Sequence, residues 1–262
     1  MSRALFASLV VLAGCAAADG TDSATSALES GTEASSLRAA NVNGGTTGAM
    51  VRATTNAGYT CAKGTWTLPD ADTTKPGEPW VYYGVGDEAG VDMEAGMAFQ
   101  EGDGTAALPH RWIPYLRQGN IFVFGDESTR VLPGTTFALE VRLDGGRVSL
   151  WRDGQRTTFA KHPPAIDSLP LALDAKKAHI RRVVGSAIST RYDGETLGTF
   201  GPVVFQSTTL CTASGGTASF HDNSHWSESR RGVLFGSVAF PASGITHLYE
   251  KTRDEDTISL FP

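Results

Sequence analysis

The sequence has few charged residues and no long run of either sign. Only 19% of its 262 residues are charged, and 22 Lys and Arg against 28 Asp and Glu give a formal net charge of −6. The basic residues form no cluster longer than the pairs Arg181-Arg182 and Arg230-Arg231. Because binding to nucleic acid requires a basic patch or stripe, we expect no nucleic acid among the partners.

Motifs of several enzyme classes are also missing. The sequence contains no glycine-rich phosphate loop, and Ser186, Ser189 and Ser207 show neither a nucleophile-elbow pattern nor a partnered histidine in sequence. His221 and His225 have a spacing that suits a metal, but no third and fourth ligands follow them. We therefore predict no metal site at these histidines and no organic cofactor.

The apolar run at the N-terminus, Ala4–Leu12, is too short to span a bilayer, which takes about 20 residues. It follows the positive charge of Arg3 and leads into Leu12-Ala13-Gly14-Cys15. This stretch resembles the lipobox of bacterial lipoproteins. The resemblance implies that residues 1–14 are a signal peptide and that Cys15 is lipidated after cleavage.

The lipobox resemblance also implies a location. The chain would contact a membrane through its lipid anchor only, in the bacterial cell envelope. Ala16 stands where some lipoproteins carry Asp, and this favours the outer membrane. An ordinary secretory peptide cut near Ala18 is the alternative interpretation.

Residues 15–53 are rich in Ala, Ser, Thr and Gly and have few large apolar side chains. Such a segment buries too little apolar surface to offset its ordering entropy, so we predict a flexible tether. Residues 54–262 are enough for one sizeable core, and we predict a single domain there.

Two of the three cysteines, Cys61 and Cys211, lie in the predicted domain. An exported chain experiences oxidising conditions, and we expect these two to form a disulfide. Two free buried thiols are the alternative.

The domain consists of short segments with period-2 alternation, separated by Gly, Pro and Asp. In 91–100 the large apolar residues fall on one parity and Asp92, Glu94 and Gln100 on the other, and 136–143 alternates in the same way. Tight glycine turns link 136–143, 147–152 and 155–160 into a meander. Only 168–179 could be helical. The predicted fold class is therefore all-β, with two packed antiparallel sheets.

The order of several short motifs supports a more specific fold. They are Gly64–Pro69, Trp80–Val85, Glu94-Ala95-Gly96, Trp112–Tyr115 and the meander Thr136–Trp151. This layout resembles the concanavalin A-like jelly rolls, and it is particularly similar to the eqolisin glutamic peptidases. The eqolisins use a glutamine and a glutamate that face each other across the sheet.

Both members of that catalytic pair are changed in this chain. Glu94 stands where the glutamine would fall, and Ala178-His179-Ile180-Arg181-Arg182 stands where the glutamate would fall. A peptidase activity is therefore disfavoured, unless His179 or Arg181 has taken another role.

The laminarinase-like glycosidases, whose strand carries Glu-x-Asp-x-Glu, are a second group of similar architecture. The corresponding residues here are Gly90, Asp92 and Glu94. A glycosidase needs two carboxyl groups beside the glycosidic bond, and these two lie on one strand face. The leading glutamate is missing, however. Asp92 and Glu94 could instead hold Ca²⁺, which prefers oxygen ligands.

We interpret the chain as an envelope lipoprotein whose sandwich binds carbohydrate or another extracellular polymer without catalysis. The side chains expected to contact the ligand are Trp80, Tyr82, Asp92, Glu94 and Gln100. A hydrolase is the alternative, with Asp92 and Glu94 as its catalytic residues and a glycosidase favoured over a peptidase. A structural envelope protein is a third interpretation.

Overall fold

The computed structural model of the chain describes residues 46–71, 78–89, 92–100, 109–119, 121–159, 164–189, 199–226, 233–235 and 245–260. The predictions about the signal peptide, Cys15 and most of the tether lie outside these residues. No helix within them is both long enough and apolar enough to cross a membrane.

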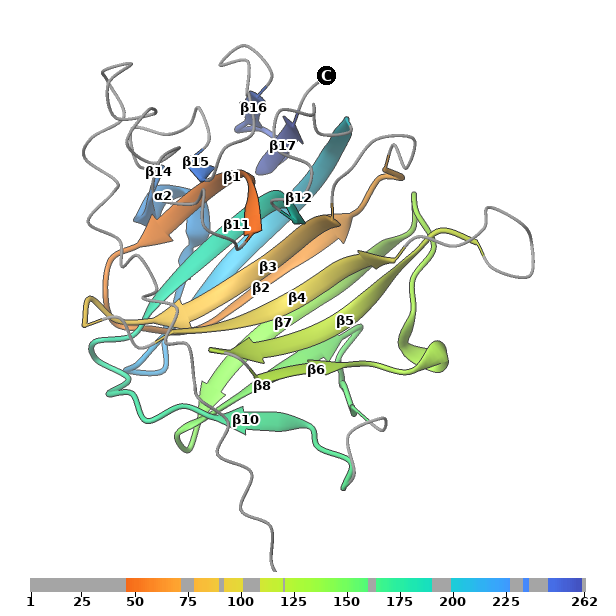
Figure 1. Ribbon diagram of the computed structural model, residues 1–262. Coiled ribbons are helices and arrows are strands. Elements are labelled where there is room, and N and C mark those ends of the chain that lie inside the picture. The colour runs from red at the N-terminus through yellow and green to blue at the C-terminus, as the bar shows by residue number, and fades with distance from the viewer. Residues whose placement is uncertain are drawn as a thin grey trace, which may run out of the picture.

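The described residues form two antiparallel sheets, seen as two layers in Figure 1. The eight-stranded sheet has the order β14 (Ser224–Trp226), β1 (Thr46–Thr55), β11 (His179–Ser189), β3 (Glu78–Gly86), β4 (Asp92–Gln100), β5 (Arg111–Gln118) and β6 (Ile121–Phe124), with β15 (Val233–Phe235) also paired to β1. Its strands supply the face on which the predicted site residues lie.

The nine-stranded sheet packs behind it. Its order is β10 (Ser168–Pro170), β8 (Arg147–Arg152), β7 (Thr136–Asp144), β2 (Tyr59–Thr67), β12 (Phe200–Thr212), β17 (Glu255–Leu260) and β16 (Ile245–Glu250), with β13 (Thr217–Ser219) beside β12 and β9 (Gln155–Arg156) beside β8. Among the residues that the structure describes, helical structure is limited to the turns η2 (Glu127–Thr129) and α2 (Phe220–Asn223). The predicted all-β sandwich is confirmed.

The core lies between the inner faces of the two sheets. Period-2 alternation puts every second side chain there, as in β4, where Met93, Ala95 and Met97 are buried. Trp66 of β2 is fully buried and contacts Tyr83 and Phe205 edge to face. Burial of such large apolar side chains is the main driving force for the packing of the sheets.

The predicted disulfide is present. Cys61 of β2 and Cys211 of β12 are bonded, face each other in neighbouring strands and have Cα atoms 4.9 Å apart. The predicted meander is also present, with Gly145, Gly146 and Gly154 at positive φ in its turns. Its third strand ends at Arg156 rather than at residue 160.

Two other boundaries differ from the predictions. Strand β1 begins at Thr46, so the domain starts before residue 54, and Val51 and Ala53 are fully buried. Because β1 contains mostly small residues, its sequence gave only a weak signal for a strand. The strand is established by its long antiparallel pairing with β11. The segment 168–179 contains β10 and a turn at its end instead of a helix, because the Leu169 backbone pairs with β8.

Candidate ligand-binding face

The side chains of the eight-stranded sheet that point away from the nine-stranded sheet form what we call the outer face. Because Met93, Ala95 and Met97 point inward, Asp92 and Glu94 of β4 point outward, as predicted. In the register of the sheet, Glu94 lies between Gly84 of β3 and Arg117 of β5. The outer face therefore brings charges from different strands into one row.

Glu94 is held by two donors from β5. The Arg117 guanidinium donates to one carboxylate oxygen at 2.9 Å, and the Tyr115 hydroxyl donates to the other at 3.1 Å. The Glu94 side chain is only 16% exposed, whereas that of Arg117 is 36% exposed. Both carboxylate oxygens are thus oriented by neighbours on one adjacent strand.

Burial changes the acidity of this group. Loss of hydration raises the pKa of Glu94, and the negative charge of Asp92 adds to the rise, while Arg117 and the Tyr115 hydroxyl oppose it. Burial, together with the charge of Glu94, also raises the pKa of Tyr82 and of Tyr115 well above that of free tyrosine. Both tyrosines therefore remain neutral hydrogen-bonding groups at neutral pH.

Asp92 forms an ion pair with Arg181 of β11, two strands away. The Arg181 side chain crosses β3 at Gly84: a Cβ placed on Gly84 would lie 3.3 Å from the Arg181 Nε and 3.7 Å from the Asp92 Oδ1. The contact therefore depends on a position without a side chain. Arg181 is 12% exposed and Asp92 is 37% exposed, so the pair lies at the surface of the sheet.

Aromatic side chains continue the outer face toward its β6 edge. The Trp80 ring contacts the Tyr115 ring edge to face, with centroids 4.9 Å apart, and lies within 6.4 Å of Phe122 and Phe124. Arg117 lies over the Phe122 ring at 4.8 Å. We call Trp80, Tyr115, Phe122 and Phe124 the aromatic shelf. Phe122 is 42% exposed, so the shelf offers apolar surface to solvent.

Tyr82 connects the shelf to the ion pairs. Its register partner on β4 is Gly96, and a Cβ on Gly96 would lie 2.2 Å from the Val81 carbonyl oxygen and 2.5 Å from the Tyr82 Cα. Only glycine fits where these strand backbones approach so closely. The Tyr82 ring lies 6.5 Å from the Tyr115 ring. The charges of both ion pairs influence the pKa of the Tyr82 hydroxyl.

The structure thus gathers four of the five predicted site residues: Trp80, Tyr82, Asp92 and Glu94. Gln100 points to the same face, but six residues along β4 place it about 20 Å from Glu94 at about 3.3 Å per residue. It accepts a hydrogen bond from Arg111 at 3.4 Å. Sequence reasoning missed Arg117 and Tyr115, because nothing local indicates which strand lies beside β4.

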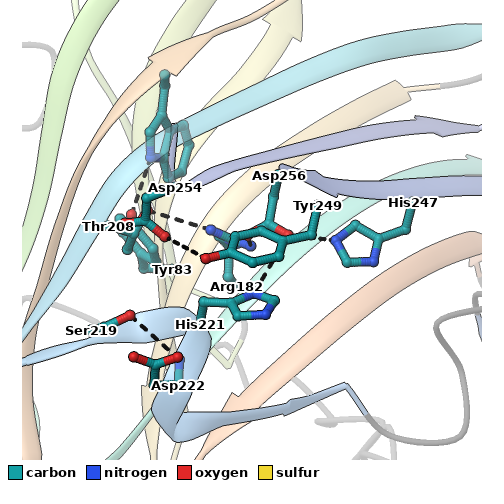
Figure 2. Close-up of polar contacts among 11 residues, drawn as sticks. Tyr83, Arg182, Thr208, Ser219, His221, Asp222, His247, Tyr249, Asp254 and Asp256 are labelled. Carbon is teal, nitrogen blue, oxygen red and sulfur yellow. Dashed lines mark hydrogen bonds and ion pairs between the residues drawn. The ribbon is translucent and has the colours of Figure 1, made fainter. Parts of the chain in front are cut away.

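A second polar cluster, shown in Figure 2, lies on the opposite side of β11. Arg182 alternates with Arg181, points inward and is 2% exposed. The Asp256 carboxylate of β17 forms a hydrogen bond with His247 of β16 at 2.6 Å and an ion pair with Arg182. Arg182 also contacts two aromatic rings. Its guanidinium lies over the rings of Phe205 and Phe220, at 4.3 and 4.4 Å. We call Arg182, Asp256 and His247 the interior cluster.

His221 of α2 joins this cluster at its rim. Its Nδ1 is 3.9 Å from the Asp256 Oδ1, and its ring stacks on Tyr249, whose hydroxyl donates to Asp254 at 3.2 Å. Within the described residues, no three His, Cys, Asp or Glu side chains gather in a way that could hold a metal ion. Asp92 and Glu94, the residues considered for Ca²⁺, each contact an arginine.

No family model matches the sequence, and comparison with curated proteins gave no match. Among solved structures, scytalido-glutamic peptidase bound to a peptide-based transition-state analogue is similar, with a TM-score of 0.50 and 9% identity over 84% of this chain and 99% of that chain. An alginate lyase from Alteromonas sp. 272 matches with a TM-score of 0.32 and 11% identity, over 53% of this chain and 55% of its own.

A glycoside hydrolase family 16 endo-glucanase from Bacteroides ovatus matches with a TM-score of 0.33 and 10% identity, over 53% of this chain and 67% of its own. At these identities the similarities concern the fold alone. The chain has the jelly-roll-like sandwich fold, and this confirms the predicted resemblance to glutamic peptidases at the level of architecture.

Proposed function

We propose that the outer face is a non-catalytic binding surface for an extended extracellular polymer, and specifically for a carbohydrate. We further propose that a lipid on Cys15 anchors the chain in the bacterial envelope, at the outer membrane, because Ala16 rather than Asp follows the cysteine. The tether would then present the sandwich at a distance from the membrane.

The observation that carries the binding proposal is that the two central carboxylates of the face, those of Asp92 and Glu94, are already engaged by arginines. Glu94 accepts from Arg117 and Tyr115, and Asp92 pairs with Arg181. A retaining glycosidase needs one carboxylate free to attack as a nucleophile and another that gives up a proton. Side chains held by arginines are instead suited to orient hydroxyl groups of a ligand, because they supply donors and acceptors in fixed positions.

The aromatic shelf supports a polymer as the ligand. Binding sites for organic ligands are mostly apolar and contain a few fixed polar groups. Aromatic faces can pack on the CH groups of a sugar ring, and Trp80, Phe122 and Phe124 contact one another and are at least partly exposed to solvent. From β11 to β6 the face spans four strand spacings, about 19 Å at about 4.8 Å each. That width fits a chain better than a single sugar.

A hydrolase remains the second candidate, because burial raises the pKa of Glu94. A carboxyl group with a raised pKa is suited to donate a proton to a leaving group. In that case Asp92 and Glu94 would be the catalytic residues. The position that would carry the glutamate of an eqolisin-like pair lies on β11, where Arg181 contacts Asp92 instead, so peptide hydrolysis is the weaker form of this candidate.

A glycan array with the purified full chain tests both candidates. We expect the wild type to bind at least one polysaccharide, and Trp80→Ala to weaken binding about tenfold, or about 1.4 kcal/mol. Trp151→Ala is the matched control, since Trp151 is a partly exposed tryptophan of the nine-stranded sheet, covered by Arg142 at 4.1 Å. Phe122→Ala repeats the test with a side chain that is 42% exposed.

The outcomes separate the candidates. If the wild type binds no glycan, the carbohydrate proposal is wrong. If the wild type releases shorter products and Glu94→Gln abolishes that release, the protein is a hydrolase. The lipid anchor is tested separately: we expect Cys15→Ser to abolish incorporation of labelled palmitate and to release the protein from the membrane fraction, and continued labelling would contradict it.

A further inference from the structure

We infer that the ligand of the outer face is a polymer of neutral sugars and that the face excludes polyanions such as uronate or sulfated chains. This inference rests on the proposed binding function and adds the chemical class of the ligand. The observation behind it is the exact matching of opposite charges at the centre of the face.

The centre carries four charged groups in two pairs. Arg181 pairs with Asp92, and Arg117 pairs with Glu94. The remaining side chains there, including Tyr82, are neutral, and its floor is glycine at Gly84. Opposite charges within one pair cancel for a ligand that approaches both partners. The centre therefore offers hydrogen-bond donors and acceptors without a net charge.

The arginines at the centre are poorly placed to attract an anion. Arg117 donates to Glu94 at 2.9 Å, and Arg181 is 12% exposed and directed at Asp92. An anionic sugar that bound one of these arginines would displace its carboxylate partner. That carboxylate would then remain buried or half-buried beside a second negative charge. Leaving a charge without its partner is most costly where the site is desolvated, as at Glu94, whose side chain is 16% exposed.

Other arginines lie at the margins of the face rather than at its centre. Arg52 is on β1, two strands from Tyr82, and Arg111 donates to Gln100 near the far end of β4. Acidic residues of the turn between β3 and β4, Asp87 and Glu88, lie at the end of the face next to Asp92. With a net charge of −6 on the whole chain, the long-range field also repels polyanions.

The aromatic shelf also favours a neutral sugar over an anionic one. Trp80, Phe122 and Phe124 offer apolar ring surface, which gains by covering the CH groups of a sugar and gains nothing from a carboxylate or sulfate. Arg117 lies over Phe122 while it holds Glu94, so the shelf and the ion pair form one continuous surface.

The experiment measures binding of the full chain to two classes of polymer by isothermal titration calorimetry. The neutral probes are a glucan, a xylan and a galactomannan, and the anionic probes are alginate and heparin. We expect binding to a neutral probe with less than about a twofold change in affinity between low and high salt, because few ions are released. We expect no binding to alginate or heparin.

A pair of substitutions makes the same test by gain of function. Asp92→Asn with Glu94→Gln removes both negative charges and keeps the shapes of the side chains, so Arg181 and Arg117 become available to an anion. We expect this variant to acquire salt-sensitive binding to alginate, at least about tenfold above the wild type. Asp144→Asn is the control, since it removes an exposed charge of the nine-stranded sheet, away from the outer face, and should acquire none.

Each result has a defined meaning. Tight, salt-sensitive binding of alginate or heparin by the wild type overturns the inference and leaves the binding function intact. A folded double variant that acquires no alginate binding also overturns it, and Asp92→Asn alone serves if the double variant does not fold. If no polymer of either class binds, the proposed carbohydrate-binding function itself is wrong.

Discussion

Arg181 of β11 forms an ion pair with Asp92 of β4, although strand β3 lies between them. The contact is possible because the residue that Arg181 crosses on β3 is Gly84, whose missing side chain leaves room above the sheet. Arg181 and Asp92 are 89 residues apart in sequence, and they are in contact because the strand between them has no side chain at this position. This arrangement makes Gly84 a determinant of the candidate site.

A side chain at Gly84 should disrupt the site at little cost to folding. In Gly84→Val, the new side chain occupies the path of Arg181 and separates it from Asp92. β-branched residues favour strands and a surface ion pair contributes little, so we expect a change of no more than about 1 kcal/mol in the free energy of unfolding. Ligand binding should weaken in the same variant. Chemical denaturation and calorimetry measure the two effects, and unchanged binding would falsify the assigned role of the Arg181–Asp92 pair.

Gly96 should respond in the opposite way. A Cβ at Gly96 would lie 2.2 Å from the Val81 carbonyl oxygen, so Gly96→Ala must force β3 and β4 apart. We expect a loss of at least about 1 to 3 kcal/mol in stability. Gly84→Ala is the matched control, because its new Cβ meets the flexible Arg181 side chain at 3.3 Å. Equal denaturation midpoints for the two alanine variants would contradict the packing seen between β3 and β4.

Glu94 should reduce the stability of the fold at neutral pH. Burial raises its pKa above that of the unfolded chain, so the folded state loses stability as the pH rises through the interval between the two values. We expect Glu94→Gln to be more stable than the wild type at pH 7, by up to about 1 kcal/mol, with the difference shrinking at pH 4. Urea denaturation at several pH values measures this difference. The opposite result would be a Glu94→Gln variant that is less stable than the wild type, with a larger deficit at pH 7 than at pH 4. It would show that the ion pair with Arg117 outweighs the cost of burial.

The interior cluster predicts loss of stability in acid. Burial disfavours ionisation of Asp256, but Arg182 and His247 more than compensate and lower its pKa from 3.8 to about 2. A depressed pKa stabilises the folded state above the unfolded value, and this stabilisation is lost as the pH falls from about 4 to about 2. It amounts to about 2 kcal/mol.

The test compares Asp256→Asn with the wild type by chemical denaturation between pH 7 and pH 2.5. We expect the variant to be destabilised by about 3 to 5 kcal/mol at pH 7, since the buried Arg182 loses its ion pair with Asp256, and to lose less stability than the wild type toward pH 2.5. Asp153→Asn, in an exposed turn of the meander, is a control for the loss of a carboxylate elsewhere. Parallel pH profiles for wild type and Asp256→Asn would rule out this role of Asp256.

The disulfide should contribute strongly, because it closes a long loop. Cys61 and Cys211 are 150 residues apart, and the chain-entropy estimate for such a loop is about 4 to 5 kcal/mol. We expect the Cys61→Ala, Cys211→Ala double variant to lose about this much in the free energy of unfolding. The same variant in reducing buffer should match the reduced wild type. An unchanged denaturation midpoint would mean that native packing around β2 and β12 suffices.

The sequence was sufficient for the class of fold and for the face on which each strand residue lies. Alternation in β4 and β7 and the glycine turns of the meander are local signals, because strand geometry and turn geometry are set by adjacent residues. These signals placed Asp92, Glu94, Trp80 and Tyr82 on one polar face. They were weaker for β1, whose small residues resemble those of a tether.

Tertiary structure alone decided which charges meet. Arg117 reaches Glu94 and Arg181 reaches Asp92 only because β5, β4, β3 and β11 are neighbours in the sheet, and strand order depends on contacts between residues far apart in sequence. The adjacent residues Arg181 and Arg182 illustrate the division. Period-2 geometry requires them to point to opposite faces, whereas their partners, Asp92 outside and Asp256 inside, are fixed by the packing of distant strands.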